Sequence, residues 1–130
     1  MIDLISVDLS SRRTLLEVSH QALVIINNSI KLVIKKITYA FQSRMGCSLE
    51  EVISIQNKIS NVINENNINT IEIVLMLLSF EEAAIVNDCL NEVCNGLKID
   101  DFEKEIGVSK EFARDLLNKL HLIIISNFEL

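Results

Sequence analysis

Residues 79–120 read SFEEAAIVNDCLNEVCNGLKIDDFEKEIGVSKEFARDLLNKL, and residues 19–59 read SHQALVIINNSIKLVIKKITYAFQSRMGCSLEEVISIQNKI. With one residue inserted near Lys36, ten positions of the two stretches are identical. They pair Ser19 with Ser79, Ile25 with Ile85, Asn27 with Asn87, Val33 with Val93, Phe41 with Phe102, Gly46 with Gly107, Ser48 with Ser109, Glu50 with Glu111, Asn57 with Asn118 and Lys58 with Lys119. Each stretch predicts a long helix, a short helix, a glycine stop, a serine cap and a third helix. This pattern indicates a tandem duplication.

The length and composition predict one helical domain. A chain of 130 residues is the size of a single domain, and it has no proline and three glycines, which favours helices. We expect an all-α fold with six or seven helices over residues 1–130. The two repeats, at about 19–59 and 79–120, form similar three-helix units that share one core, and a polar linker at about 64–69 separates them.

Local signals predict where the helices begin and end. A wide apolar face runs through residues 12–46, as one long helix or as two with a kink. Ser48-Leu-Glu-Glu51 and Ser79-Phe-Glu-Glu82 are capping boxes, and Thr70 is placed to cap a short apolar helix over 71–78. The apolar tail from Leu122 extends the last helix or forms a short terminal strand pair with residues 1–7.

Several classes of function are excluded by the composition. The longest uncharged apolar run, residues 73–80, is too short to span a bilayer, and no signal peptide is evident, so a cytoplasmic protein is expected. The spacing of Cys47, Cys89 and Cys94 is not that of a zinc site, and we interpret them as buried, reduced residues. No catalytic motif is present. The sequence therefore predicts no enzyme, no cofactor and no metal site.

Charge is distributed unevenly along the chain. Residues 1–60 have seven basic and five acidic side chains, whereas residues 61–130 have five basic and thirteen acidic ones. An acidic surface speeds the encounter with a basic partner. We therefore identify eight carboxylates of the second half as candidate partner-binding residues. They are Glu81, Glu82, Asp88, Glu92, Asp100, Asp101, Glu103 and Glu105.

In size, acidity, helicity and lack of catalytic residues, the whole chain resembles small bacterial immunity proteins and antitoxins. The resemblance is one of type and carries no diagnostic motif, so it assigns no residue. It implies a non-catalytic, immunity-type inhibitor that binds a basic toxin or effector protein through the acidic surface.

Two alternative functions stay open. Phe102-x4-Gly107-Val108-Ser109-x2-Phe112 resembles the turn and second helix of a helix-turn-helix, with Lys110 and Arg114 as candidate DNA contacts. The surrounding carboxylates repel phosphate, so nucleic acid is not the expected partner. The other alternative is a structural homodimer that pairs through its apolar tail, residues 122–130.

Overall fold

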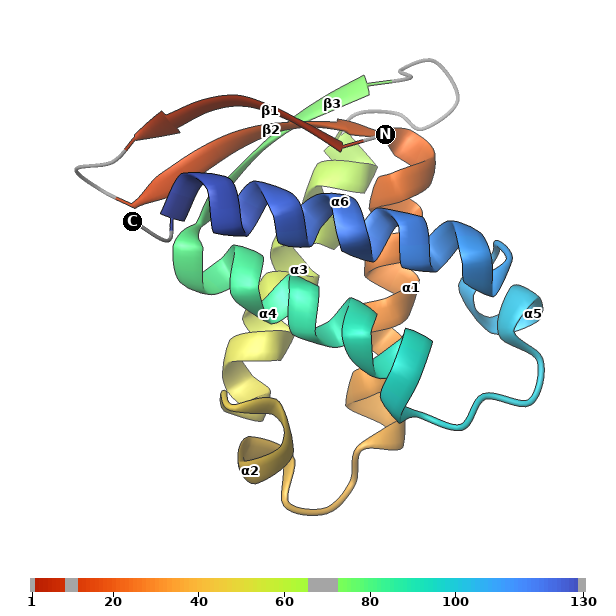
Figure 1. The fold of residues 1–130 in the computed structure, drawn as a ribbon. Coiled ribbons are helices and arrows are strands. Elements are labelled where there is room, and N and C mark those ends of the chain that lie inside the picture. The colour runs from red at the N-terminus through yellow and green to blue at the C-terminus, as the bar shows by residue number, and fades with distance from the viewer. Residues whose placement is uncertain (1, 9–11, 66–72, 129–130) are drawn as a thin grey trace.

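The fold consists of a three-stranded antiparallel sheet packed against a group of helices (Figure 1). The structure is a computed structural model that describes residues 2–8, 12–65 and 73–128. The strands are β1 (Ile2–Asp8), β2 (Arg13–Ser19) and β3 (Ile73–Ser79), and the sheet order is β1-β2-β3. The helices are α1 (His20–Lys36), α2 (Phe41–Met45), α3 (Leu49–Glu65), α4 (Phe80–Asn91) with its π-helical extension η1 (Glu92–Gly96), α5 (Phe102–Ile106) and α6 (Lys110–Phe128).

The prediction of an all-α fold is wrong, because two segments expected to be helical are strands of this sheet. The predicted helix from Arg12 begins only at His20, and the seven residues before it form β2. Thr14, Leu16 and Val18 are buried while their neighbours are not, which is the two-residue period of a strand. Three apolar residues close together, Leu15, Leu16 and Val18, also fit a helical face, and this ambiguity caused the error.

The predicted short helix over 71–78 is the second error. Residues 73–79 form β3, whereas Thr70 and Ile71 lie outside the described residues, as do residues 66–69 of the predicted linker. Val74, Met76 and Leu78 are buried under the sheet, and Ile73, Leu75 and Leu77 point the other way. Both faces of this strand are apolar, so its two-residue period is invisible in the sequence.

Of the two alternatives predicted for the C-terminal tail, the extension of the last helix is confirmed, and the strand pair with residues 1–7 is wrong. β1 pairs with β2 in an antiparallel register that joins Ile2 to Val18 and Asp8 to Arg13. The C-terminal tail instead continues α6 as far as Phe128. In Figure 1, α6 passes beneath the sheet, and it contacts β1 as a helix rather than as a strand.

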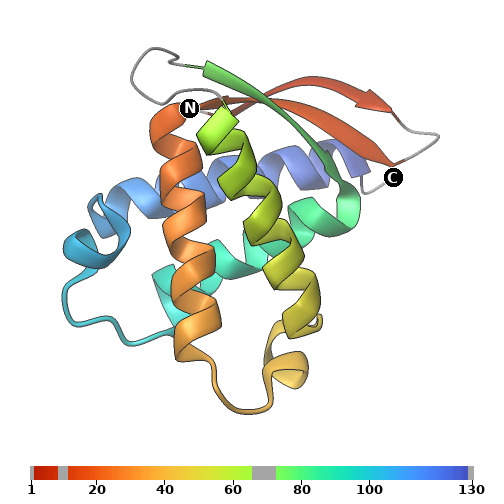
Figure 2. The same cartoon turned by 180° about the vertical axis from the view of Figure 1, so that it is seen from behind.

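The two halves of the chain contain the same order of elements, each beginning with a strand that the three-helix prediction lacked. β2 leads through Ser19 into α1, and β3 leads through Ser79 into α4, and in both cases the serine Oγ accepts a backbone N–H of the first turn. α1 packs antiparallel to α3 (Figure 2), and α4 packs similarly against α6. Contacts between the halves are reciprocal, since α1 contacts α5 and α2 contacts α4.

One hydrophobic core lies between the sheet and the helices. Its largest fully buried side chains come from both halves and from the inner face of the sheet. They are Leu16, Leu23, Ile25, Ile26, Ile30, Ile59, Met76, Leu78, Leu90, Ile106, Leu116 and Leu120. The halves therefore stabilise each other by burying a shared apolar surface.

Candidate functional site

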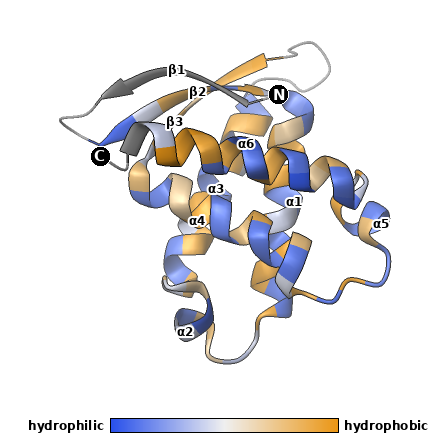
Figure 3. Cartoon of the chain, in the orientation of Figure 1, coloured by the Kyte–Doolittle hydropathy of each residue, from blue (hydrophilic) through white to orange (hydrophobic). Residues whose placement is uncertain are grey.

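The most exposed apolar row of the described residues lies on the outer face of β3. The side chains of Ile73, Leu75 and Leu77 are 52, 58 and 42% exposed. They alternate with the buried residues of the same strand, so β3 carries hydrophobic residues on both faces. The ribbon of β3 is accordingly coloured orange, as hydrophobic (Figure 3). Outer strand positions are normally polar when they face water. A row of three exposed apolar residues on one strand therefore makes this face a candidate binding surface.

The neighbouring strand extends this surface only in part. Leu15 of β2 lies directly opposite Leu77, and it is half-buried. Glu17 lies opposite Leu75 and introduces a charge at the next outer position of β2. The apolar surface is therefore concentrated on β3 and at Leu15. We call Leu15, Ile73, Leu75 and Leu77 the outer row.

β3 is also an edge strand, with β2 on one side and no described strand on the other. The Phe80 N–H donates to the Arg12 carbonyl at 2.8 Å, and this bond fixes which backbone groups face β2. Along a strand, the backbone N–H and C=O groups of successive residues point to opposite sides. Since those of Phe80 face β2, the N–H and C=O groups of Ile73, Leu75 and Leu77 point to the open edge. Edge strands are usually protected by charge, proline or a bulge. Residues 73–78 include no charge and no proline, and their pairing with β2 is regular.

The eight predicted carboxylates lie on different elements of the fold. Glu81, Glu82, Asp88 and Glu92 lie along α4 and η1, whereas Asp100, Asp101, Glu103 and Glu105 lie at or just before α5. The two groups are on separate elements, and in Figure 1 α5 lies well away from the start of α4. The sequence predicted that most of these residues are exposed. It did not predict that they are divided between α4 with η1 and the region of α5.

Two carboxylates of the α4 group pair with cations of the first half of the chain. Glu82 Oε1 accepts hydrogen bonds from Lys58 Nζ at 2.9 Å and from the Ser79 N–H at 2.9 Å. Glu92 forms an ion pair of 2.7 Å with Arg44 of α2. The uneven charge of the two halves is therefore used in part to hold the halves together.

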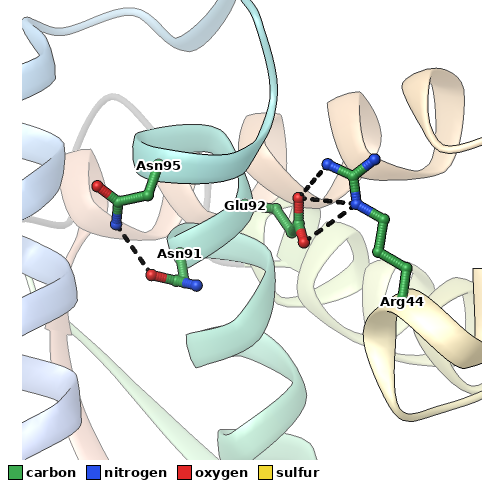
Figure 4. A network of polar contacts seen from close by, with 4 residues as sticks. All are labelled: Arg44, Asn91, Glu92 and Asn95. Atoms are coloured by element: carbon green, nitrogen blue, oxygen red, sulfur yellow. Dashed lines mark hydrogen bonds and ion pairs between the residues drawn. The ribbon is translucent and has the colours of Figure 1, made fainter.

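Figure 4 shows the Arg44–Glu92 pair in detail. Both Nε and Nη2 of Arg44 donate to the Glu92 carboxylate, which is the bidentate geometry that gives a guanidinium its specificity (Figure 4). The hydrogen bonds to Glu92 raise the pKa of Arg44. Gly96, one turn after Glu92, lies directly against the Glu92 carboxyl group. Because Gly96 has no side chain, the Glu92 carboxyl group can occupy this space and contact Arg44.

The α5 group is the more exposed of the two groups. Asp101 caps α5 by accepting the Lys104 N–H at 3.3 Å, and Asp100, Glu103 and Glu105 are exposed. Glu105 also lines a pocket of about 190 Å³ whose other walls include the cations Lys31 and Lys35 of α1. We call Asp100, Asp101, Glu103 and Glu105 the acidic corner.

A polar groove between α4 and α6 was not predicted from the sequence. It has a volume of about 390 Å³, and Asn87, Asn91 and Asn95 line one side of it. These three residues recur every four positions, a spacing that places them on one side of a helix. The Asn95 side-chain amide donates to Asn91 Oδ1 at 2.9 Å (Figure 4), whereas Asn87 Oδ1 is buried without a hydrogen-bond partner in the structure.

The helix-turn-helix alternative has the expected local geometry but not a favourable charge. Gly107 ends α5 in the left-handed conformation with a φ of 102°, and Ser109 Oγ then accepts the Phe112 N–H at 3.2 Å. Lys110 and Arg114 are exposed on α6. The acidic corner lies just before them in the chain, and its carboxylates oppose contact with phosphate.

Comparison of the chain with protein-family models, with characterised proteins and with solved structures gives no match. Within the part of the chain that the structure describes, no three His, Cys, Asp or Glu side chains gather as metal ligands would. None of the helices in that part combines the length and hydrophobicity needed to cross a membrane.

Proposed function

We propose that the chain is a non-catalytic protein-binding protein that binds its partner on the outer row and the open edge of β3. The observation that carries this proposal is the exposure of Ile73, Leu75 and Leu77 on a strand that has no described neighbour on one side. A partner strand added at this edge gains main-chain hydrogen bonds and covers apolar surface in the same step.

The size of the exposed row supports binding rather than chance exposure. Each of the three residues has a large apolar side chain. When a partner covers it, the favourable free energy is roughly 25 cal/mol for each Å² of apolar surface removed from water. Exposed apolar residues are common when scattered singly, but here three occupy consecutive outer positions of one strand. Covering them stabilises a complex without any contribution from charge.

Comparative capture of binding proteins tests the proposal. The tagged protein and its Leu75→Lys variant are compared with Leu122→Lys, because Leu122 is 61% exposed on α6 and gives a matched apolar-to-lysine change elsewhere. We expect the bound protein to be lost from Leu75→Lys and kept by Leu122→Lys, with circular dichroism unchanged in both. Identical capture by all three proteins would reject β3 as the binding surface.

The immunity-type function is a second candidate, now proposed for the acidic corner alone. Its support is that Asp100, Glu103 and Glu105 are exposed within one short segment. Such an inhibitor would bind a basic toxin or effector, as the resemblance to immunity proteins implies. The nearby Lys31 and Lys35 weaken the negative potential of this corner.

Charge reversal separates this candidate from the first. The double variant Glu103→Lys/Glu105→Lys is compared with Glu50→Lys/Glu65→Lys, which reverses two exposed carboxylates of α3. If a basic partner binds the acidic corner, the first pair lowers the association rate at low salt and the second pair changes it little. Equal association rates would exclude the acidic corner.

A further inference from the structure

We propose that the protein that binds β3 is a second copy of this chain, so that two sheets join into one six-stranded sheet. The proposal rests on the proposed function of β3 and names its partner. The two β3 strands would run antiparallel about a two-fold axis at Leu75. Three features of β3 favour a copy of itself over another protein.

The first feature is the register that the edge-facing backbone groups allow. With the axis at Leu75, Leu75 lies opposite the copy's Leu75, and Ile73 lies opposite the copy's Leu77. All three residues have N–H and C=O groups directed at the edge, so roughly six main-chain hydrogen bonds form. An axis at Met76 would instead place Ile73 opposite Ser79, whose N–H already donates to Glu82. Of these two registers, self-pairing therefore favours the one with its axis at Leu75.

The second feature is the complementarity of the side chains in that register. The outer positions pair leucine with leucine and isoleucine with leucine, and cross-strand apolar pairs stabilise a sheet. A two-fold axis brings every residue close to its own copy or its symmetry mate, so a charged strand would repel itself. Residues 73–78 include no charged side chain, although the chain has a net charge of −6.

The third feature is that the chain already contains a pairing of this kind. β2 and β3 are antiparallel, and their register joins Arg13 to Ser79, Leu16 to Met76 and Ser19 to Ile73. The central residues Leu16 and Met76 are equivalent positions of the two halves, each three residues before the capping serine, so the two equivalent strands pair about an approximate two-fold axis. Pairing of β3 with its copy repeats this geometry at the other edge of β3.

Self-association and cross-linking of purified protein test the proposal. Sedimentation equilibrium measures the dimer dissociation constant of the unaltered chain, of Leu75→Lys and of Leu122→Lys. The Leu122→Lys variant also tests for an interface on α6. A lysine at position 75 would face its own copy across the axis, and we expect the dimer to weaken about tenfold or more. Leu75→Cys should form a disulfide-linked dimer under mild oxidation, because paired Cα atoms lie roughly 5.5 Å apart. Leu122→Cys is the matched control.

The outcomes distinguish this proposal from the proposed function. The proposal of a second copy is supported if Leu75→Lys weakens the dimer and Leu75→Cys forms a disulfide-linked dimer. If the protein stays monomeric at all concentrations, the proposal of a second copy is overturned. The proposed function would still stand if the chain captures a different protein and Leu75→Lys abolishes that capture. A dimer lost only in Leu122→Lys overturns the β3 interface in favour of α6. Cys47, Cys89 and Cys94 are buried, so they do not confuse the cross-linking.

Discussion

Leu16 and Met76 lie opposite each other at the middle of the β2–β3 ladder, and both are almost completely buried. Each residue is three positions before the serine that caps the following helix, Ser19 for α1 and Ser79 for α4. The central pair of the ladder therefore consists of equivalent positions of the two halves. Any change at one of them acts on the region where the two halves meet.

Truncation of this pair should destabilise the fold. Leu16→Ala and Met76→Ala are each expected to lower the free energy of unfolding by about 2–5 kcal/mol, because each leaves a cavity at the centre of the core. The two losses should not add in the double variant, since the residues are cross-strand neighbours. Urea unfolding measures all three values. Leu15→Ala, which shortens a half-buried residue of the outer row, is the control and should cost less.

The strands show where sequence reasoning about the fold failed. Gly46 and Gly107 were predicted as helix stops, and both end helices in the left-handed conformation. The capping boxes at Ser48 and Ser79 were also predicted and are present. These signals are local, so a few residues suffice to recognise them. Whether an apolar run such as 73–78 is a strand depends on which strand it pairs with, and that information is not local.

The site was less predictable than the fold. The sequence identified exposed carboxylates, but it could not show that Glu92 would meet Arg44 of α2, because the two are distant in sequence. The exposed apolar row was missed because Leu75 and Leu77 were assigned to the short apolar helix predicted over 71–78. Recognition of the strand would have predicted their exposure from the alternation alone.

Gly96→Ala should break the Arg44–Glu92 ion pair. A methyl group at position 96 would overlap the Glu92 carboxyl group and lie close to Arg44 Nη2, so the carboxylate must shift and its present geometry with Arg44 is lost. The measurement is a double-mutant cycle with Arg44→Ala, using urea unfolding. The effect of Gly96→Ala should differ between the two backgrounds, because only one of them contains the pair. An identical effect in both backgrounds would contradict this account.

Asp88→Asn should stabilise the protein at neutral pH. Partial desolvation of the Asp88 carboxyl group, together with the negative charge of Glu92, raises its pKa above the usual aspartate value. The folded protein therefore retains a proton on Asp88 over a range in which the unfolded chain has lost it. Within that range the contribution of Asp88 to stability decreases as pH rises. The variant removes this penalty, and its advantage over the unaltered chain should be present at pH 7.

The pH dependence is the sharper part of this test. Well below about pH 4 Asp88 is protonated in both states, so the stabilising effect of Asp88→Asn should vanish there. Asp100→Asn, at an exposed position before α5, is the matched control and should change stability little at either pH. A stability gain from Asp88→Asn that is independent of pH would mean that the charge is not its cause.

The three cysteines should react with thiol reagents only when the protein unfolds. Cys47, Cys89 and Cys94 are buried, and desolvation raises the pKa of each thiol, so little thiolate is present at neutral pH. The rate of modification in native buffer should be slow and should rise with urea in parallel with unfolding. Fast modification of one thiol without denaturant would show that its region opens locally.

Glu82 should contribute to stability through two separate contacts, one with the backbone and one with a side chain. Its carboxylate accepts the Ser79 N–H as part of the capping box and also pairs with Lys58 of α3. Ser79→Ala removes the serine half of the box and should cost about 1 kcal/mol, within the usual range for an N-cap. Glu82→Gln keeps an acceptor for the Ser79 N–H but removes the charge, so its cost should be smaller than that of Glu82→Ala, which loses both contacts.

Ser19→Ala, at the corresponding cap without a glutamate partner, is the control. If Glu82→Gln and Glu82→Ala were equally destabilising, the hydrogen bond to Ser79 would add nothing and the Lys58 pair alone would account for the role of Glu82.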